Sequence, residues 1–152
     1  MSPGVLAMIP DAERQFIDFL AQRKLKYTSQ RRTILVEAFR AKGHFTADAL
    51  LDLAKKKDRS IGKATLYRTL SLLKESRILE EQDFGGGRKS YEPLLGHPHH
   101  DHLICVQCHK ILEFENDEIE RIQEEEARKL GFKTVFHSHK LFGFCRDCAG
   151  RK

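Results

Sequence analysis

The four cysteines of this 152-residue chain form two pairs with identical spacing. They are Cys105 with Cys108 and Cys145 with Cys148, and two residues separate the members of each pair. Four thiolates can surround one Zn²⁺ ion as a closed tetrahedral shell. A single Cys-x-x-Cys pair would fit a redox-active dithiol or a disulfide equally well. Two matched pairs that use every cysteine favour a structural zinc site, which would join the two ends of a small domain.

A second cluster of metal-type ligands lies just before the first cysteine pair. Four histidines and one aspartate fall within six residues: His97, His99, His100, Asp101 and His102. In an extended segment, alternate side chains point to opposite faces. His100 and His102 would then share one face, and His99 and Asp101 the other. The segment therefore predicts ligands for two different metal sites; the alternative is an exposed polar hinge that happens to be rich in histidine.

The same cluster also fits an enzyme. His97, His99, Asp101 and His102 match the H-x-H-x-D-H pattern of metallo-β-lactamase-type hydrolases, in which two zinc ions supply a hydroxide nucleophile. Such a fold needs a larger sandwich and further ligands downstream, and this chain is too short for it. It also has no His-Glu-x-x-His motif, and a zinc site would leave no cysteine as a nucleophile. A zinc-dependent hydrolase is therefore the weaker hypothesis, and we expect no catalytic residues.

Apolar residues recur at helical spacing in four segments of the front half. The first helix is expected after Asp11 as N-cap, and the second should end near Lys42-Gly43. Thr46 is the expected cap of the third, and Gly62 precedes the fourth. Four helices of this kind can form a small bundle or part of a DNA-binding domain.

A β-hairpin is predicted after the fourth helix, with runs at 78–84 and 88–92 around the glycines 85–87. Helices followed by a hairpin predict a winged helix-turn-helix, in which the last helix enters the major groove. The alternative is a helical bundle with an incidental hairpin. Polar residues are expected to be exposed on the reading helix and at the hairpin tip: Lys63, Thr65, Arg68, Thr69, Arg88 and Lys89.

Charge is divided unevenly along the chain. Residues 11–74 hold fifteen Lys and Arg against seven Asp and Glu, whereas residues 93–152 hold nine against ten. A basic front half favours a polyanionic partner, although charge alone fits a solvated lysine-rich surface equally well. Paired thiols without a secretory signal or a membrane-length apolar run predict a cytoplasmic location.

The rear half is expected to be a small α/β domain after a hinge at residues 93–98. Its predicted elements are strands at 103–106, 111–114 and 132–142 and a helix at about 117–130. Ile119, Ile122, Ala127 and Leu130 should face inward from that helix. Short strands with open edges favour pairing across a dimer. The fold class is therefore α+β, with two domains that are each small enough to need a zinc ion or a partner for stability.

Together these features resemble the ferric uptake regulator family of bacterial metal-sensing repressors over about residues 20–150. The resemblance is carried by Lys26-Tyr27-Thr28-x-x-Arg31, the helix Ala64-Thr65-Leu66-Tyr67-Arg68-Thr69-Leu70, the run from His99 to Cys108, and Cys145-x-x-Cys148. It implies a homodimer, with a tetramer as a further possibility. It also implies a winged-helix DNA-binding domain at residues 1–92, of which 1–12 are an uncertain extension, and a metal-binding dimerisation domain at 99–152.

The resemblance implies two metal sites besides the zinc. The regulatory site would lie between the domains and comprise His44, Glu92, His100 and His102. The second site would comprise His99, Asp101, Glu120 and His137, with His139 as a rival ligand. His109 is expected to face solvent.

The resemblance further implies an operator of double-stranded, A·T-rich, palindromic DNA. Tyr67 and Arg68 would act in the major groove and Lys26 in the adjacent minor groove, while Arg31 would contact phosphate. The alternative for Tyr67 is burial among the helices.

Nitrogen and oxygen ligands suit Fe(II), Mn(II), Co(II) or Zn(II). Peroxide-sensing relatives typically have aspartate where this chain has Glu120, and zinc-uptake relatives add a cysteine that this chain lacks. Fe(II) is therefore the expected regulatory metal beside the structural Zn(II). A peroxide-, manganese- or zinc-responsive member of the family is the alternative.

Overall fold

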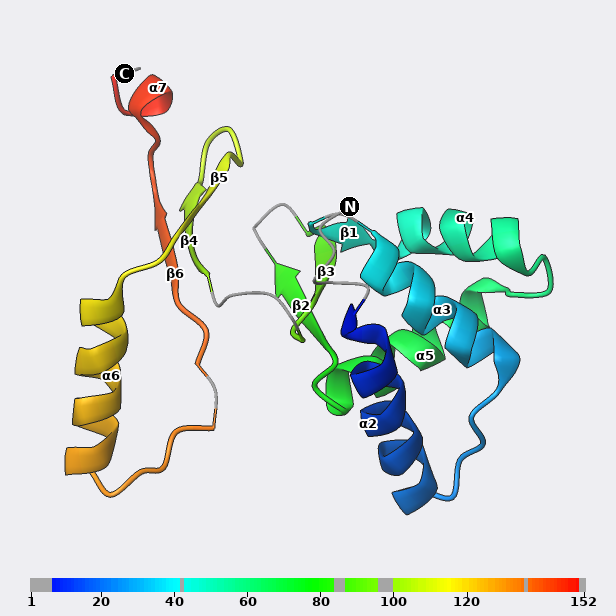
Figure 1. Ribbon diagram of the computed structural model, residues 1–152. Coiled ribbons are helices and arrows are strands. Elements are labelled where there is room, and N and C mark those ends of the chain that lie inside the picture. The colour runs from blue at the N-terminus through cyan, green and yellow to red at the C-terminus, as the bar shows by residue number, and fades with distance from the viewer. Residues whose placement is uncertain (1–6, 42, 84–86, 96–99, 136, 151–152) are drawn as a thin grey trace. The chain divides into compact units, whose positions relative to one another are not determined.

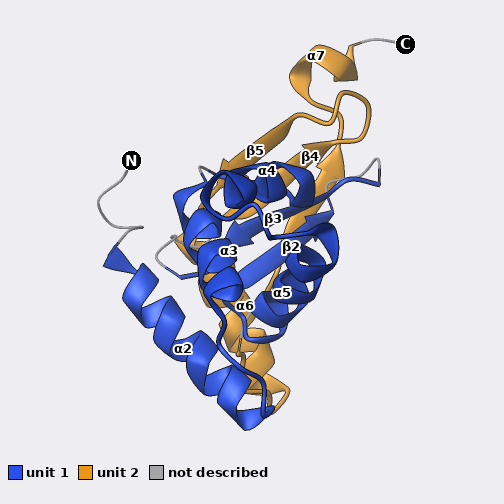
Figure 2. Ribbon diagram, turned by 90° about the vertical axis from the view of Figure 1, so that its right-hand side faces the viewer, with its two compact units in different colours: residues 1–97 blue, residues 98–152 orange. Residues whose placement is uncertain are grey.

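The computed structural model describes residues 7–41, 43–83, 87–95, 100–135 and 137–150. The chain divides into two compact units, residues 1–97 (unit 1) and 98–152 (unit 2), which Figure 2 distinguishes by colour.

Unit 1 is a bundle of helices followed by a hairpin (Figure 1). Its elements are α2 (Ile9–Gln22), α3 (Ser29–Arg40), β1 (Phe45–Thr46), α4 (Ala47–Lys57), α5 (Lys63–Glu75), β2 (Leu79–Asp83) and β3 (Lys89–Pro93). The three strands form an antiparallel sheet in the order β1-β3-β2. This arrangement confirms the predicted winged helix-turn-helix, with α5 as the reading helix and the β2–β3 hairpin as the wing.

Side-chain caps explain where two of these helices begin. The Thr28 hydroxyl accepts a hydrogen bond from the Arg31 backbone N–H, and the Thr46 hydroxyl accepts one from Ala49, each at 3.2 Å. The predicted cap of the first helix was wrong: α2 begins at Ile9 after Met8, and Asp11 lies within its first turn. A carboxylate there still favours the helix because it faces the positive end of the helix dipole.

The core of unit 1 comes from the apolar stripes of its helices. Leu66, Leu70 and Leu73 of α5 are each at most 1% exposed, as the spacing predicted. Thr69 is also buried, contrary to the expectation of an exposed polar residue, and its hydroxyl donates to the Thr65 carbonyl at 2.8 Å. It lies beside Leu70 at the edge of the stripe, where packing against the bundle decides its exposure.

The wing is anchored by a continuous register between its strands. Leu79 pairs with Pro93 and Asp83 with Lys89 at the two ends of the hairpin. Residue 84 at the end of the first predicted run, residues 85 and 86 of the predicted turn and residues 96–98 of the predicted hinge lie outside the described residues. Because Pro93 belongs to β3, the strand continues one residue into the segment expected to be a hinge.

Unit 2 is a small α/β unit built on a three-stranded sheet. Its elements are β4 (Asp101–Cys105), β5 (Ile111–Phe114), α6 (Asp117–Lys129), β6 (Lys140–Gly143) and α7 (Arg146–Ala149). The sheet order is β5-β4-β6, with β5 antiparallel and β6 parallel to the central strand. A parallel pairing needs a crossover, and the connection through α6 provides it.

Two expectations for unit 2 were wrong. The strand predicted at 132–142 is paired only from Lys140 to Gly143, because β4 offers just five residues for pairing. No α6 residue is buried, and Ile122 and Leu130 of the expected inward face are 46% and 77% exposed in this chain. None of the described helices is long and apolar enough to cross a membrane.

Candidate metal centres and DNA-facing surface

The four cysteines meet at one end of unit 2. One sulfur from each lies within 4.8 Å of all the others, and the thiols of Cys108 and Cys145 are 3.6 Å apart. Cys105 ends β4, Cys108 follows in the turn before β5, and Cys145 and Cys148 lie at the start of α7 and within it. All four are free thiols, and a separation of 3.6 Å is far longer than a disulfide bond. The cluster therefore joins the beginning and end of the unit.

The electrostatics of this cluster call for a cation. The backbone N–H groups of Cys108 and Cys145 point toward the Cys105 sulfur and lower the pKa of that thiol to about 6. The hydrogen bond with Cys145, together with burial, raises the pKa of the Cys148 thiol to about 12. Four thiolates this close repel one another unless a dication neutralises them. The donor set fits Zn²⁺, whose structural sites commonly use four cysteines.

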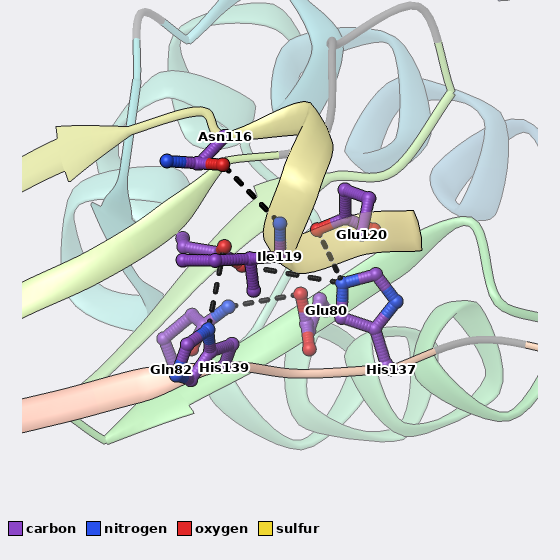
Figure 3. Close-up of polar contacts among 8 residues, drawn as sticks. Glu80, Gln82, Asn116, Ile119, Glu120, His137 and His139 are labelled. Carbon is purple, nitrogen blue, oxygen red and sulfur yellow. Dashed lines mark hydrogen bonds and ion pairs between the residues drawn. The ribbon is translucent and has the colours of Figure 1, made fainter. Parts of the chain in front are cut away.

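A second ligand cluster lies on the opposite side of β4 from His102. Asp101, Glu120 and His137 each bring one ligand atom within 4.8 Å of the others. The His137 Nε2 atom is 3.1 Å from Glu120 Oε1 and 4.0 Å from Asp101 Oδ1 (Figure 3). The Asp101 side chain is only 1% exposed, so its carboxylate is committed to these neighbours. Three residues of the predicted second site are thus together, and His99 lies outside the described residues.

His139 competes for the same aspartate. Its Nδ1 atom is 3.4 Å from Asp101 Oδ2, the oxygen not facing His137. A backbone hydrogen bond fixes the position of His139, because the His102 N–H donates to the His139 carbonyl at 3.1 Å. Neither His137 nor His139 lies in a strand, although both fall within the strand predicted at 132–142. A loop brings both imidazoles to the cluster.

Glu120 reaches this cluster from the first turn of α6. The Asn116 side chain caps that helix by accepting hydrogen bonds from the backbone N–H groups of Glu118 and Ile119 at 3.0 and 3.2 Å; the second is drawn in Figure 3. The cap sets where α6 starts and hence which face Glu120 occupies. Carboxylates and imidazoles in this combination can bind Fe(II), Mn(II) or Zn(II).

The regulatory ligands predicted in unit 1 form a pair. His44 Nε2 lies 3.1 Å from Glu92 Oε2, and both side chains are less than 20% exposed. The sheet register explains the pairing, because Phe45 is opposite Tyr91 and the next residues outward are His44 and Glu92. An imidazole and a carboxylate in contact are suited to share a metal ion.

The regulatory ligands predicted in unit 2 face glutamates. His102 is 3% exposed, and its Nε2 atom is 3.9 Å from Oε1 of Glu113, its register partner on β5. His100 Nδ1 is 2.9 Å from Glu115 Oε1. Glu113 and Glu115 are potential ligands that sequence reasoning missed. Glu113 lies in β5 and Glu115 follows the last residue of that strand, so their two-residue spacing could have suggested a shared face, but only the pairing of β5 with β4 places Glu113 opposite His102.

The reading helix α5 exposes part of the predicted DNA-contacting set. Lys63, Tyr67 and Arg68 are exposed, while Thr65 is partly buried. Tyr67 is 48% exposed, so its alternative placement among the helices was wrong.

The residues predicted to contact the minor groove or the DNA phosphates differ in their surroundings. Lys26 is exposed in the loop before α3, and the Arg31 guanidinium donates to the Lys26 carbonyl. In the wing, Arg88 is exposed, and the Lys89 ammonium is 3.1 Å from Glu81 Oε1. Arg31 therefore braces the loop that carries Lys26.

Comparison with known proteins settles the family. The sequence pattern of the Ferric uptake regulator family matches residues 22–142. The chain belongs to the ferric uptake regulator family. A relative, the Ferric uptake regulation protein of Campylobacter jejuni, is 43% identical over 140 residues, covering 91% of this chain and 88% of that protein. Ferric uptake regulators are metal-responsive transcriptional regulators that bind DNA as dimers, and they are not enzymes.

Solved structures of ferric uptake regulators share this fold. The regulator from Helicobacter pylori, described as having three functional metal-binding sites, matches with a TM-score of 0.74 at 26% identity over 97% of both chains. The Pseudomonas aeruginosa regulator, solved with manganese, matches with a TM-score of 0.73 at 29% identity, covering 84% of this chain and 95% of that one. Both likenesses support the winged helix and the small α/β unit as a ferric uptake regulator architecture.

Proposed function

We propose that this chain is a transcriptional repressor that binds its operator when loaded with ferrous iron. The observation that carries the proposal is the contact between His44 and Glu92 in the winged-helix unit. These two side chains are half of the regulatory ligand set implied by the family resemblance. The names of the relatives support iron as the signal over manganese, zinc or peroxide.

The structural metal would be Zn(II), bound by Cys105, Cys108, Cys145 and Cys148. Their convergence, with all four sulfurs within 4.8 Å of one another, supports this role. A zinc ion held there would stabilise unit 2, which buries few large apolar side chains of its own.

The regulatory ion would be bound by His44 and Glu92 of unit 1 and by His100 and His102 of unit 2. Ligands from both units would restrict how the units move relative to each other, and in a dimer this sets the spacing of the two reading helices. Tighter DNA binding by the metal-loaded form requires tighter metal binding by the DNA-bound form, by the same factor. His99, Asp101, Glu120 and His137 would form the second site, which supports the fold of unit 2 beside the sheet.

The DNA surface would centre on α5. Tyr67 and Arg68, both exposed, would contact bases in the major groove, with Lys63 and Thr65 beside them. Lys26 would enter a narrow A·T-rich minor groove, which attracts cationic side chains. Arg31, Arg88 and Lys89 would contact or position the phosphate backbone. A palindromic operator follows from the two-fold symmetry of a dimer.

Dimerisation is supported by an apolar groove on the sheet of unit 2. The side chains lining it include Leu103, Leu112, Leu141, Phe142 and Phe144, which are 40–63% exposed in the single chain. A contiguous apolar surface of this kind favours contact with a second copy. Tetramers would use a further surface. As a DNA-binding regulator the protein would act in the cytoplasm and would have no catalytic activity of its own.

The test is an anoxic titration of operator affinity with Fe(II), Mn(II) and Zn(II), using an A·T-rich palindromic duplex and zinc-loaded protein. We expect Fe(II) to raise affinity at least tenfold and a chelator of the labile metal to reverse the effect. His100→Ala should weaken the response, whereas His109→Ala, an exposed histidine outside both sets, should not. Equal DNA affinity with and without labile metal would contradict the proposal.

A further inference from the structure

Gln82 is a buried amide next to a proposed metal ligand. It lies on β2 of the wing, and its side chain is only 1% exposed. Its Nε2 atom donates to Glu92 Oε1 at 3.1 Å and to Glu80 Oε2 at 2.9 Å; the second contact is drawn in Figure 3. The other oxygen of Glu92, Oε2, faces His44 at 3.1 Å. The two carboxylate oxygens of Glu92 are thus divided between an amide donor and an imidazole.

The sheet register explains this arrangement. Glu80 is directly opposite Glu92, and Gln82 is opposite Ser90, so all four side chains share one face of the hairpin. Two carboxylates directly across a strand pair repel each other. The Gln82 amide lies against both and supplies one N–H group to each.

The orientation of the amide is chemically determined. A flipped side chain would place the Gln82 carbonyl oxygen against two carboxylates, which cannot donate to it when ionised. In the orientation observed, Gln82 Oε1 is buried and accepts no hydrogen bond within the described part of the chain. A buried acceptor without a donor costs about 1–3 kcal/mol. Stability alone therefore does not account for glutamine at position 82, and its contact with Glu92 points to a role in orienting that carboxylate.

We infer that Gln82 is a positioning residue of the regulatory metal site. Its amide holds Glu92 Oε1 and thereby turns Oε2 toward His44, so the two ligands of unit 1 are in place before a divalent cation binds. Groups that orient metal ligands in this way typically change metal affinity by 10- to 100-fold when removed. The inference rests on the proposed role of His44 and Glu92 as regulatory ligands.

The test is a titration with Mn(II) alone, followed by the electron paramagnetic resonance signal of the free ion, on zinc-loaded full-length protein. A Glu120→Ala background removes the proposed second site. Gln82→Met keeps the length of the side chain but removes both donors, and we expect it to raise the dissociation constant 10- to 100-fold. Glu80→Gln is the matched control, since it leaves the amide of Gln82 in contact with Glu92, and it should change the constant less than threefold.

Two further measurements separate positioning from general damage to the fold. The effect of Gln82→Met should vanish in a Glu92→Ala background, because the amide then has no ligand to orient. At saturating Mn(II), Gln82→Met should bind operator DNA as tightly as the unsubstituted protein. If Gln82→Met lowers the melting temperature strongly, the Gln82→His variant is tested in its place. A neutral histidine retains one N–H donor, and this variant should keep its Mn(II) affinity within about threefold.

The possible failures are distinguishable. If folded Gln82→Met binds Mn(II) as the unsubstituted protein does while His44→Ala loses affinity, the positioning role is wrong and the proposed function stands. If folded Gln82→His loses as much Mn(II) affinity as His44→Ala, hydrogen-bond donation to Glu92 does not explain the effect of Gln82, and the positioning role is likewise wrong. If His44→Ala and Glu92→Ala both bind Mn(II) normally, the regulatory ligand set itself is wrong.

Discussion

Tyr27 donates its phenol hydrogen to Oε1 of Glu13 across 2.7 Å and so joins the loop before α3 to helix α2. The Arg32 Nε–H donates to the same oxygen at 2.7 Å, and the Tyr27 ring packs edge-on against Phe16 with centroids 6.0 Å apart. Lys26, the proposed minor-groove residue, immediately precedes Tyr27. The contact between Tyr27 and Glu13 therefore anchors the loop that presents Lys26.

Tyr27→Phe should lower the free energy of unfolding by about 1 kcal/mol, because it removes one hydrogen bond to a carboxylate and leaves the ring packing in place. Chemical denaturation at neutral pH measures the change. Tyr67→Phe is the matched control: Tyr67 is 48% exposed, and its stability effect should be near zero. Equal losses of unfolding free energy for the two substitutions would argue against a stabilising hydrogen bond between Tyr27 and Glu13.

The same contact predicts a pH dependence. The hydrogen bond from Tyr27 is the main cause that lowers the pKa of Glu13 below its ordinary value of 4.5. A carboxylate with a lowered pKa contributes stability above its ordinary pKa, and this contribution is lost as the pH falls through the lowered value. The stability difference between the unsubstituted protein and Tyr27→Phe should therefore shrink below about pH 4.5. Denaturation curves between pH 7 and pH 3 would show it, and a constant difference would contradict it.

Cys105→Ser should remove one zinc equivalent per chain and destabilise unit 2. Three remaining thiolates cannot close a tetrahedral shell, and Cys105 is one of the two buried cysteines and accepts hydrogen bonds from backbone N–H groups. Elemental analysis and calorimetry would measure zinc content and melting. Zinc stripped from the unsubstituted protein by a strong chelator should reproduce the same melting curve. A variant with full zinc content and an unchanged melting temperature would show that Cys105 is not a ligand.

Substitutions can decide whether His137 or His139 is the histidine ligand of the second metal site. In a His44→Ala background, His137→Gln should weaken Co(II) binding at the second site at least tenfold, because His137 contacts both Glu120 and Asp101. His139→Gln should have a smaller effect, since it contacts Asp101 alone among these carboxylates. The visible absorption of bound Co(II) reports the affinity. A larger loss for His139→Gln would assign the ligand role to His139 instead.

Tyr67→Ala should reduce operator affinity about tenfold, equivalent to about 1.4 kcal/mol, while changing stability by less than about 0.5 kcal/mol. The exposed ring can be removed without leaving a cavity in the core. Fluorescence anisotropy with metal-loaded protein measures the affinity. Gln22→Ala, an exposed position at the end of α2, serves as the control and should bind normally. Unchanged affinity for Tyr67→Ala would place the DNA contact elsewhere.

The elements of this protein follow largely from local sequence. Thr28 and Thr46 cap helices through bonds three residues away, and the leucine stripe of α5 buries itself because helical spacing puts its members on one side. The alternation of Asp101 and His102 across β4 is equally local, since successive strand residues face opposite sides. Spacing alone likewise indicated that the two cysteine pairs serve one ion. Each of these features depends on residues at most a few positions apart or on matched short motifs.

The partners of the functional side chains depended on the tertiary structure. Glu113 meets His102 only because β5 pairs with β4 in one register, and Gln82 meets Glu92 only through the register of the wing. The loop that carries His139 to Asp101 has no periodic pattern from which to predict its path. Register and loop paths are decided by which distant segments pack together. The sequence by itself therefore determined which residue types could bind metal and DNA, and the tertiary structure decided which of them share a site.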